Sequence, residues 1–193
     1  MAKVSNREKI LDAGLKLVHE RGYGAAGVRD IVQAAGVPQG SFTNHFASKE
    51  AFGLEILEMY FANSRSVIDA TLRNDARPAL ERLRAYLKAN KDHIGLEGMR
   101  NGCLLGNFSA EVVDQSEPMR LRLVEIFNEV RAAVAYCLTA AVAAREVRAD
   151  LDVETIAGFI VSGLQGSILL AKAERDVGPV ERFEETLFSA VLH

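Results

Sequence analysis

Apolar residues recur every three or four positions along most of this chain, which is the spacing of an amphipathic α-helix. No stretch alternates between apolar and polar residues at the period of a strand, and no internal repeat is present. The predicted helices begin at or beside residues that favour a helix start, namely Ser5, Gly27, Pro38, Ser48, Pro78, Cys103, Pro118, Asp152 and Pro179. The pattern predicts an all-α chain of about nine helices.

The ends of several helices are predicted from equally local features. Ser5 and Glu8 have the spacing of a capping box, and Gly22 is expected to end the helix that they begin. The fourth helix is predicted to run to about Arg73, and the sixth to about Asp114. Short connections between these helices predict a chain made of two helical parts.

Residues 28–50 predict two short helices joined by a tight turn. The first has one apolar face and ends at Gly36, which adopts a left-handed conformation at little cost. Pro38 is predicted to begin the second helix, where its missing N–H does no harm. Phe42 and Phe46 lie one turn apart on that helix and are expected to point inward. This arrangement predicts a helix-turn-helix.

The outer face of the second helix is expected to carry short or hydrogen-bonding residues. Such a face can enter the major groove of DNA and reach the edges of the bases. We expect Arg29 and Lys49 to neutralise phosphates at the two ends of the motif, while His45 either touches a phosphate or packs at an edge. The residues expected to contact or approach bases are Gln39, Gly40, Ser41, Thr43 and Asn44. The motif therefore predicts binding to double-stranded DNA.

The same region resembles the TetR family of transcription regulators. The resemblance runs from Ile10 to about Leu57 through Gly22, Asp30-Ile31, Ala34-Ala35-Gly36-Val37, Gly40, His45-Phe46 and Ser48-Lys49-Glu50. The chain departs from the family at Gln39, often a lysine, and at Thr43, usually a tyrosine, and both changes remove groups that reach phosphate. The resemblance implies a three-helix DNA-binding domain in residues 1–50 and a helical ligand-binding and dimerisation domain in residues 51–193.

Charge is distributed unevenly along the chain, whose net charge is −3. Residues 1–50 contain seven Lys and Arg against five Asp and Glu, whereas residues 51–193 contain sixteen against twenty-one. The basic excess thus lies with the helix-turn-helix, and its small size favours a few placed phosphate contacts over a general polyanion surface.

Several other features bear on location and chemistry. The polar N-terminal sequence is not typical of a secretory signal, and two cysteines form no disulfide framework, so we expect a cytoplasmic protein. The longest uncharged stretch, Thr155 to Ala171, includes glycines and polar residues, which favours a buried helix over a membrane span. The four histidines lack metal-ligand spacing, and we expect no metal, cofactor or catalytic site.

One cysteine, Cys103, lies at the predicted start of the sixth helix, where free N–H groups and the helix dipole favour a thiolate. The stretch 101–111, together with 116–120 and 166–172, resembles a TetR-family branch represented by NemR and AcuR, which respond to reactive electrophiles and acrylate-type compounds. The resemblance implies that Cys103 and Lys172 are paired for sensing. Residue type alone favours an inert cysteine and a solvated lysine, so both interpretations stay open.

The eighth predicted helix is apolar on more than one side, and Gly158, Ser162 and Gly166 form a ridge of small residues along it. Periodicity alone allows this helix and the ninth to pair within one chain or across a two-fold axis. Family resemblance favours a homodimer, with Gly163 and Leu164 at its interface.

These observations lead to one principal functional hypothesis and two alternatives. The principal hypothesis is a homodimeric repressor that binds a palindromic operator and responds to a small effector, such as a reactive electrophile or a small unsaturated acid. One alternative is a thiol-dependent enzyme that uses Cys103, although no base or oxyanion partner is recognisable. The other is a DNA-binding module controlled by a partner protein.

Overall fold

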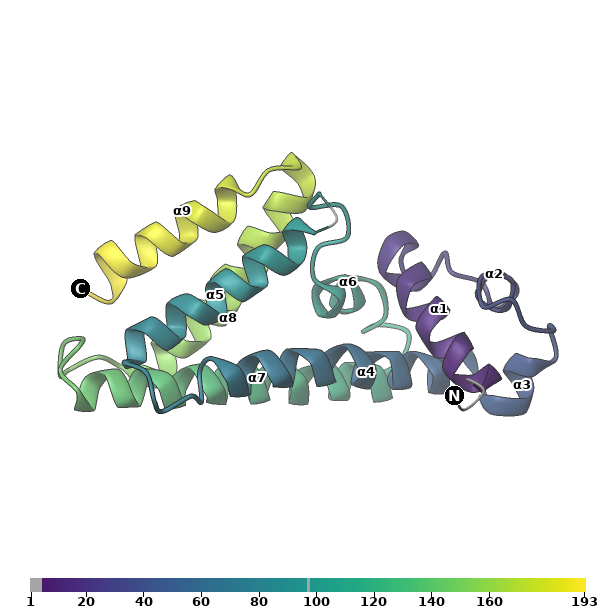
Figure 1. Cartoon of the computed structure of the whole chain (residues 1–193), viewed down its shortest axis with the longest axis horizontal. Helices are drawn as coiled ribbons and strands as arrows, with labels where there is room; N and C mark the ends of the chain where they lie inside the picture. Colours follow the sequence, from purple (N-terminus) through teal and green to yellow (C-terminus); the bar gives the residue numbers. More distant parts are fainter. Residues whose placement is uncertain (1–4, 97) are drawn as a thin grey trace. The chain divides into compact units, whose positions relative to one another are not determined.

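The computed structural model describes residues 5–96 and 98–193, and every regular element in these ranges is helical (Figure 1). The prediction of an all-α chain with nine α-helices is confirmed for this part of the sequence. In chain order the helices are α1 (Asn6–Arg21), α2 (Val28–Ala34), α3 (Ser41–His45), α4 (Lys49–Ala70), α5 (Ala79–Gly95), α6 (Leu104–Glu111), α7 (Glu117–Ala143), α8 (Val153–Glu174) and α9 (Gly178–Thr186). A π-helical turn, Leu187–Val191, follows α9 and was not predicted.

The helices form two compact units, neither of which is a continuous stretch of sequence. The first unit contains the described residues up to Ala62 together with Leu104–Val124. The second contains the described residues of 63–103 together with Glu125–His193. Helix α6 and the start of α7 therefore belong with the N-terminal helices. The functional division into residues 1–50 and 51–193 stays a prediction.

The first unit has a small core of its own, built on three phenylalanines. The rings of Phe42, Phe46 and Phe52 have centroids 5.1 to 5.4 Å apart, and all three side chains are buried. Gly14 admits this cluster because a Cβ at that position would lie 2.3 Å from the Phe52 ring. The aromatic surfaces buried in this way hold α3 against α4, and Phe52 also packs against Gly14 of α1.

Helix starts follow the local signals closely. Ser5 and Glu8 form the predicted capping box, with hydrogen bonds of 2.8 and 3.2 Å. Ser48 accepts from the Ala51 N–H at 3.0 Å, and Asp152 accepts from the Thr155 N–H at 3.1 Å. Helix ends match less well, since α4 ends at Ala70 and α6 at Glu111, each three residues before its predicted end.

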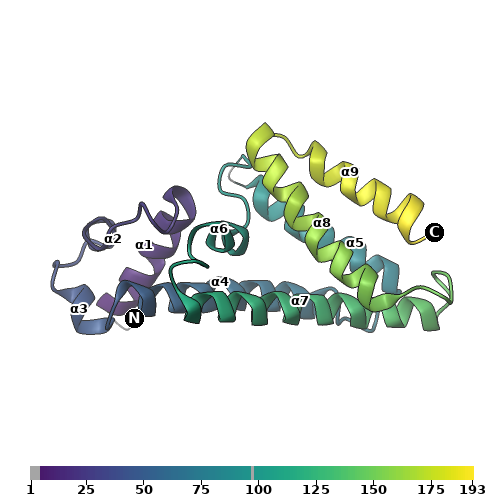
Figure 2. The same cartoon turned by 180° about the vertical axis from the view of Figure 1, so that it is seen from behind.

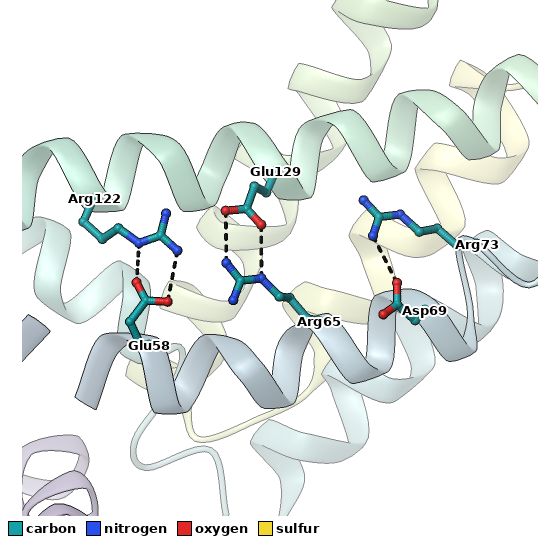
Figure 3. A network of polar contacts seen from close by, with 6 residues as sticks. All are labelled: Glu58, Arg65, Asp69, Arg73, Arg122 and Glu129. Carbon is teal, nitrogen blue, oxygen red and sulfur yellow. Dashed lines mark hydrogen bonds and ion pairs between the residues drawn. The ribbon is translucent and has the colours of Figure 1, made fainter. Parts of the chain in front are cut away.

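In each unit, α4 and α7 lie side by side and are joined by an arginine–carboxylate pair (Figure 3). Arg122 of α7 binds both carboxylate oxygens of Glu58 in the first unit. Arg65 of α4 binds both oxygens of Glu129 in the second, at 3.1 and 3.2 Å. The acid lies on α4 in one pair and on α7 in the other, so a seven-residue slip would bring like charges together. Both pairs favour the observed register, and the half-exposed Arg65–Glu129 pair adds little stability.

In the second unit α8 and α9 lie side by side (Figures 1 and 2), and Lys91 of α5 lies 3.6 Å from Glu181 and Glu184 of α9. Its close packing corrects one expectation from the sequence. A Cβ at Gly163 would lie 2.4 Å from the ring of Phe183, and Leu164 is 2% exposed. Leu164 is therefore buried by its own chain and is not available to an interface between two copies, whereas Gly163 is half-buried and its place in such an interface stays a prediction.

Helices α7 and α8 are long and apolar enough to cross a membrane, judged by length and composition alone. Core helices of folded domains often pass the same test, and α8 buries Ala157, Ile160 and Ile168 inside the second unit. Other apolar side chains of α8 stay uncovered, among them Phe159, Leu169 and Leu170. The apolar character of α8 therefore reflects two faces, only one of which the chain itself buries.

Candidate nucleic-acid interface

The turn between α2 and α3 is built by backbone hydrogen bonds around a left-handed glycine. Gly36 has φ of +63°, and the Val37 N–H donates to the Val32 carbonyl at 3.1 Å. The predicted start of the recognition helix is wrong, because the Pro38 carbonyl accepts from the Ser41 N–H at 2.9 Å and forms a turn. Helix α3 begins three residues later, at Ser41, and is five residues long.

Most of the predicted DNA-contacting side chains are exposed. Arg29 lies on α2, Gln39 and Gly40 lie in the turn, Lys49 begins α4, and the other predicted residues lie on α3. Thr43 donates its hydroxyl proton to the Gly40 carbonyl at 3.1 Å, which leaves its methyl group and lone pairs outward. The exposed residues of this set are Arg29, Gln39, Gly40, Thr43, Asn44 and His45.

Ser41 is the exception, and its predicted outward position is wrong. The residue is 8% exposed, and its hydroxyl oxygen accepts from the Asn6 side chain at 3.5 Å. Because α3 begins at Ser41, this side chain lies at the first helical position beside buried Phe42. Ser41 thus helps to hold α3 against α1.

Lys49 begins α4, and its side chain is bound to the chain itself. The ammonium donates to the Tyr23 carbonyl at 2.6 Å and lies 4.5 Å from the centre of the Tyr23 ring. The Tyr23 hydroxyl returns a hydrogen bond of 2.9 Å to the Lys49 carbonyl. Burial lowers the pKa of Lys49, and the nearby Glu111 charge opposes this shift. A phosphate contact by Lys49 stays a prediction, made with the donors that Tyr23 does not use.

A polar cluster around the α1–α2 turn had no counterpart in the sequence-based prediction. Glu111, the last residue of α6, accepts from the Gly24 N–H at 3.1 Å. The Ser116 hydroxyl donates to the Glu50 carboxylate at 2.6 Å. Burial, together with the Glu50 charge, raises the pKa of Tyr23 to about 12. These contacts join residues that lie far apart in the sequence. Of the residues in this turn, only Gly22 was identified from the sequence.

The predicted sensing residues lie in the second unit. Cys103 is half-buried and directly precedes α6, as expected. The backbone beside it packs on the stem of Lys172, because a Cβ at Gly102 would lie 3.1 Å from Lys172 Cδ. Burial, with a smaller contribution from the Cys103 charge, raises the pKa of Tyr86 to about 12. A functional pairing of Cys103 with Lys172 stays a prediction.

Cys137 has a different environment. The side chain is 1% exposed, and its thiol donates to the Ala79 carbonyl at 3.1 Å. Burial raises the pKa of this thiol to about 11, which disfavours the reactive thiolate. Cys137 is therefore a packed structural cysteine. Across residues 5–96 and 98–193, no group of three His, Cys, Asp or Glu is arranged to hold a metal ion.

Two protein-family models match this chain. The model described as "Bacterial regulatory proteins, tetR family" matches residues 10–56, which include α2, the turn and α3. The model described as "Tetracyclin repressor-like, C-terminal domain" matches residues 79–187, more than half of the chain.

Individual relatives match along nearly the whole length. The chain is 36% identical over 192 residues to the HTH-type transcriptional repressor DhaR from Mycobacterium sp. (strain GP1), covering 100% of this chain and 95% of that protein. It is 31% identical over 179 residues to the transcriptional regulator AcuR from Cereibacter sphaeroides, covering 93% of this chain and 82% of that protein. The crystal structure of the reduced form of NemR from E. coli is similar with a TM-score of 0.83 and 28% identity, covering 95% of this chain and 96% of that one. The similarity therefore extends through both units.

Proposed function

Because this chain belongs to the tetR family of bacterial regulatory proteins, we propose that it represses transcription as a homodimer bound to a palindromic DNA operator. The family and the relatives named above are transcription regulators, so the alternative of a Cys103-dependent enzyme is set aside. The observation that carries the proposal is the exposed polar face formed by Gln39 in the turn and by Thr43 and Asn44 on α3, a short helix whose Phe42 is buried. Such a face fits the major groove. We place the protein in the cytoplasm, where its operator lies.

The uncovered face of α8 supports the homodimer. Phe159, Leu169 and Leu170 are 45, 65 and 52% exposed, and their spacing places them along one stripe with Ser162 and Gly166. A Cβ at Gly166 would meet nothing within 4 Å, so another helix can approach closely there. Leaving such a stripe in water is unfavourable, and a second copy of α8 would bury it. A two-fold dimer presents two α3 helices to half-sites roughly 34–36 Å apart.

The effector is proposed to bind in the second unit at Cys103 and Lys172. NemR was crystallised in a form described as reduced, which supports thiol chemistry in this branch. With an unsaturated carbonyl compound, the Cys103 sulfur would bond to the β-carbon, the carbon–carbon π bond would break, and the α-carbon would take a proton from water. With a small unsaturated acid, the Lys172 ammonium would instead pair with the carboxylate.

Release of DNA is proposed to occur by a population shift. An effector that binds more tightly to the dimer with poorly spaced α3 helices moves the equilibrium toward that state. The free energy of this shift equals the difference between the effector's binding free energies for the two states. Added bulk in a close-packed unit provides such a difference.

A DNA-release assay with the purified chain tests the effector site, with acrylate and N-ethylmaleimide as probes. We expect release by N-ethylmaleimide to be lost in Cys103→Ser, and release by acrylate to be weakened in Lys172→Ala. Cys137→Ser is the matched control and should respond like the unmodified chain, because that thiol is buried. Release that is unchanged in both test variants contradicts the effector site. A chain that responds to neither probe favours control by a partner protein.

A further inference from the structure

Helix α6 lies near the end of α1 (Figures 1 and 2), and its last turn contacts the loop that joins α1 to α2. Phe108 and Glu111, three residues apart on α6, both face this loop. The Phe108 ring lies 5.2 Å from the ring of Tyr23, and the Glu111 carboxylate accepts from the Gly24 N–H. All of these residues belong to the first unit.

Gly22 shows how closely the Glu111 carboxylate approaches the loop. A Cβ at Gly22 would lie 2.7 Å from Glu111 Oε1 and 3.0 Å from Oε2. Gly22 also has φ of +89°, a conformation that strains residues with a Cβ. The loop therefore has both the space and the backbone conformation that the carboxylate contact requires.

The loop is connected to both helices that flank the recognition helix. Tyr23 exchanges two hydrogen bonds with Lys49, the first residue of α4. Gly24 lies three residues before Gly27, the N-cap residue of α2. Since α3 lies between α2 and α4 in the chain, fixing this loop fixes the two supports of α3.

From this geometry we propose that Glu111 is a positioning residue for DNA recognition. Its carboxylate holds the α1–α2 loop so that α2 and α4 present α3 in the orientation that fits the major groove. The inference rests on DNA binding through α3 and is independent of the effector. Glu111 itself does not touch DNA in this account.

The direction of the change in DNA affinity distinguishes a positioning role of Glu111 from a purely electrostatic one. A carboxylate near a DNA-binding surface repels phosphates. If charge were its only effect, removing the carboxylate would raise DNA affinity. Removing a positioning contact lowers affinity for the operator, because α3 no longer docks in one orientation. Exposed Asp114, three residues beyond Glu111, is the matched control for the loss of one negative charge.

The experiment compares three variants of the full chain on an operator selected by the unmodified chain from random duplex DNA. We expect Glu111→Ala to lower operator affinity about tenfold, the size of one lost charged hydrogen bond, while affinity for nonspecific DNA stays equal or rises. Glu111→Gln keeps an oxygen that can accept from Gly24 and should recover most of the loss. Asp114→Asn should bind slightly more tightly.

Amide hydrogen exchange at Gly24 provides a second measurement on the same proteins. Exchange at this amide should quicken in Glu111→Ala while exchange in the α4 core stays slow. Operator affinity of Glu111→Ala that equals or exceeds that of the unmodified chain overturns the positioning role. Equal losses on operator and nonspecific DNA also overturn it, as does a Gln variant as defective as Ala. Failure of the unmodified chain to select any sequence would instead count against the proposed function.

Discussion

The two units of this protein hold their functional surfaces in contrasting ways. In the first, a five-residue recognition helix is fixed by directional contacts such as Asn6 to Ser41 and Lys49 to Tyr23. In the second, long apolar helices bury large side chains and leave a stripe of α8 uncovered. We therefore expect operator affinity to respond to the loss of single polar groups in the first unit, whereas dimer formation should depend on the apolar area of α8.

A charge on the stripe of α8 should have the largest effect. Leu169→Glu would place a carboxylate in the proposed dimer interface without a partner, which costs several kcal/mol. We expect this variant to sediment as a folded monomer and to lose operator binding. Leu96→Glu is the matched control, since Leu96 is 83% exposed outside α8, and it should stay dimeric. A Leu169→Glu protein that remains dimeric would remove α8 from the interface.

Two substitutions in the first unit should separate specificity from general affinity. Asn44→Ala should reduce discrimination between operator and nonspecific DNA, by about 1–3 kcal/mol if Asn44 makes a bidentate base contact. Lys49→Ala should weaken both kinds of binding and lower the salt dependence, as expected for a phosphate contact, and it should weaken operator binding further because the contact with Tyr23 is lost. Titrations at several salt concentrations measure both effects. If neither change alters binding, the DNA-contacting face is assigned incorrectly.

Two buried groups of the second unit, the Tyr86 phenol and the Cys137 thiol, predict a loss of stability at high pH. Tyr86 ionises near 10 in an unfolded chain, and burial raises its pKa to about 12 in the folded one. Between these values the unfolded chain has lost the proton that the folded chain keeps, so the free energy of unfolding falls by about 1.4 kcal/mol per pH unit. This loss is absent below pH 10 and complete above pH 12.

Urea unfolding of Tyr86→Phe between pH 10 and 12 measures that contribution. We expect the free energy of unfolding to decline less steeply with pH than in the unmodified chain. In both proteins the buried Cys137 thiol contributes in the same direction from pH 9 upward. An identical pH dependence in the two proteins would show that the Tyr86 phenol is not kept protonated by burial.

The smallest effect is expected at the exposed ion pairs between α4 and α7. Arg65→Met should change the free energy of unfolding by less than about 1 kcal/mol, because Arg65 and Glu129 are both about 40% exposed. The change should shrink further in 1 M salt, where the Debye length is about 3 Å. A loss of several kcal/mol would mean that this pair does more than favour a register.

Features encoded by neighbouring residues were predicted well from sequence. The caps at Ser5, Ser48 and Asp152 each depend on a hydrogen bond to a residue three positions away, so the chain shows them directly. The start of α3 was misplaced because proline favours both a first helical position and a turn, and the Pro38–Ser41 hydrogen bond selects the turn.

Features that depend on distant residues could not be predicted in this way. Buried Ser41 is bound by Asn6, 35 residues earlier, and Gly24 is bound by Glu111, 87 residues further along the chain. Leu164 was expected at an interface between two copies, yet its own chain buries it. Periodicity identifies an apolar face, but it does not say which helix will cover that face.

Selection of bound sequences from a library of random duplex DNA tests whether this protein binds an operator as a homodimer. If two copies of α3 read adjacent turns of the major groove, the selected sequences will be inverted repeats with half-sites about 10 base pairs apart. Sedimentation of the selected duplex with the protein should then give two chains, or a multiple of two, per site. Enrichment of a single asymmetric site that binds one chain, or no enrichment at all, would contradict a homodimeric operator-binding repressor.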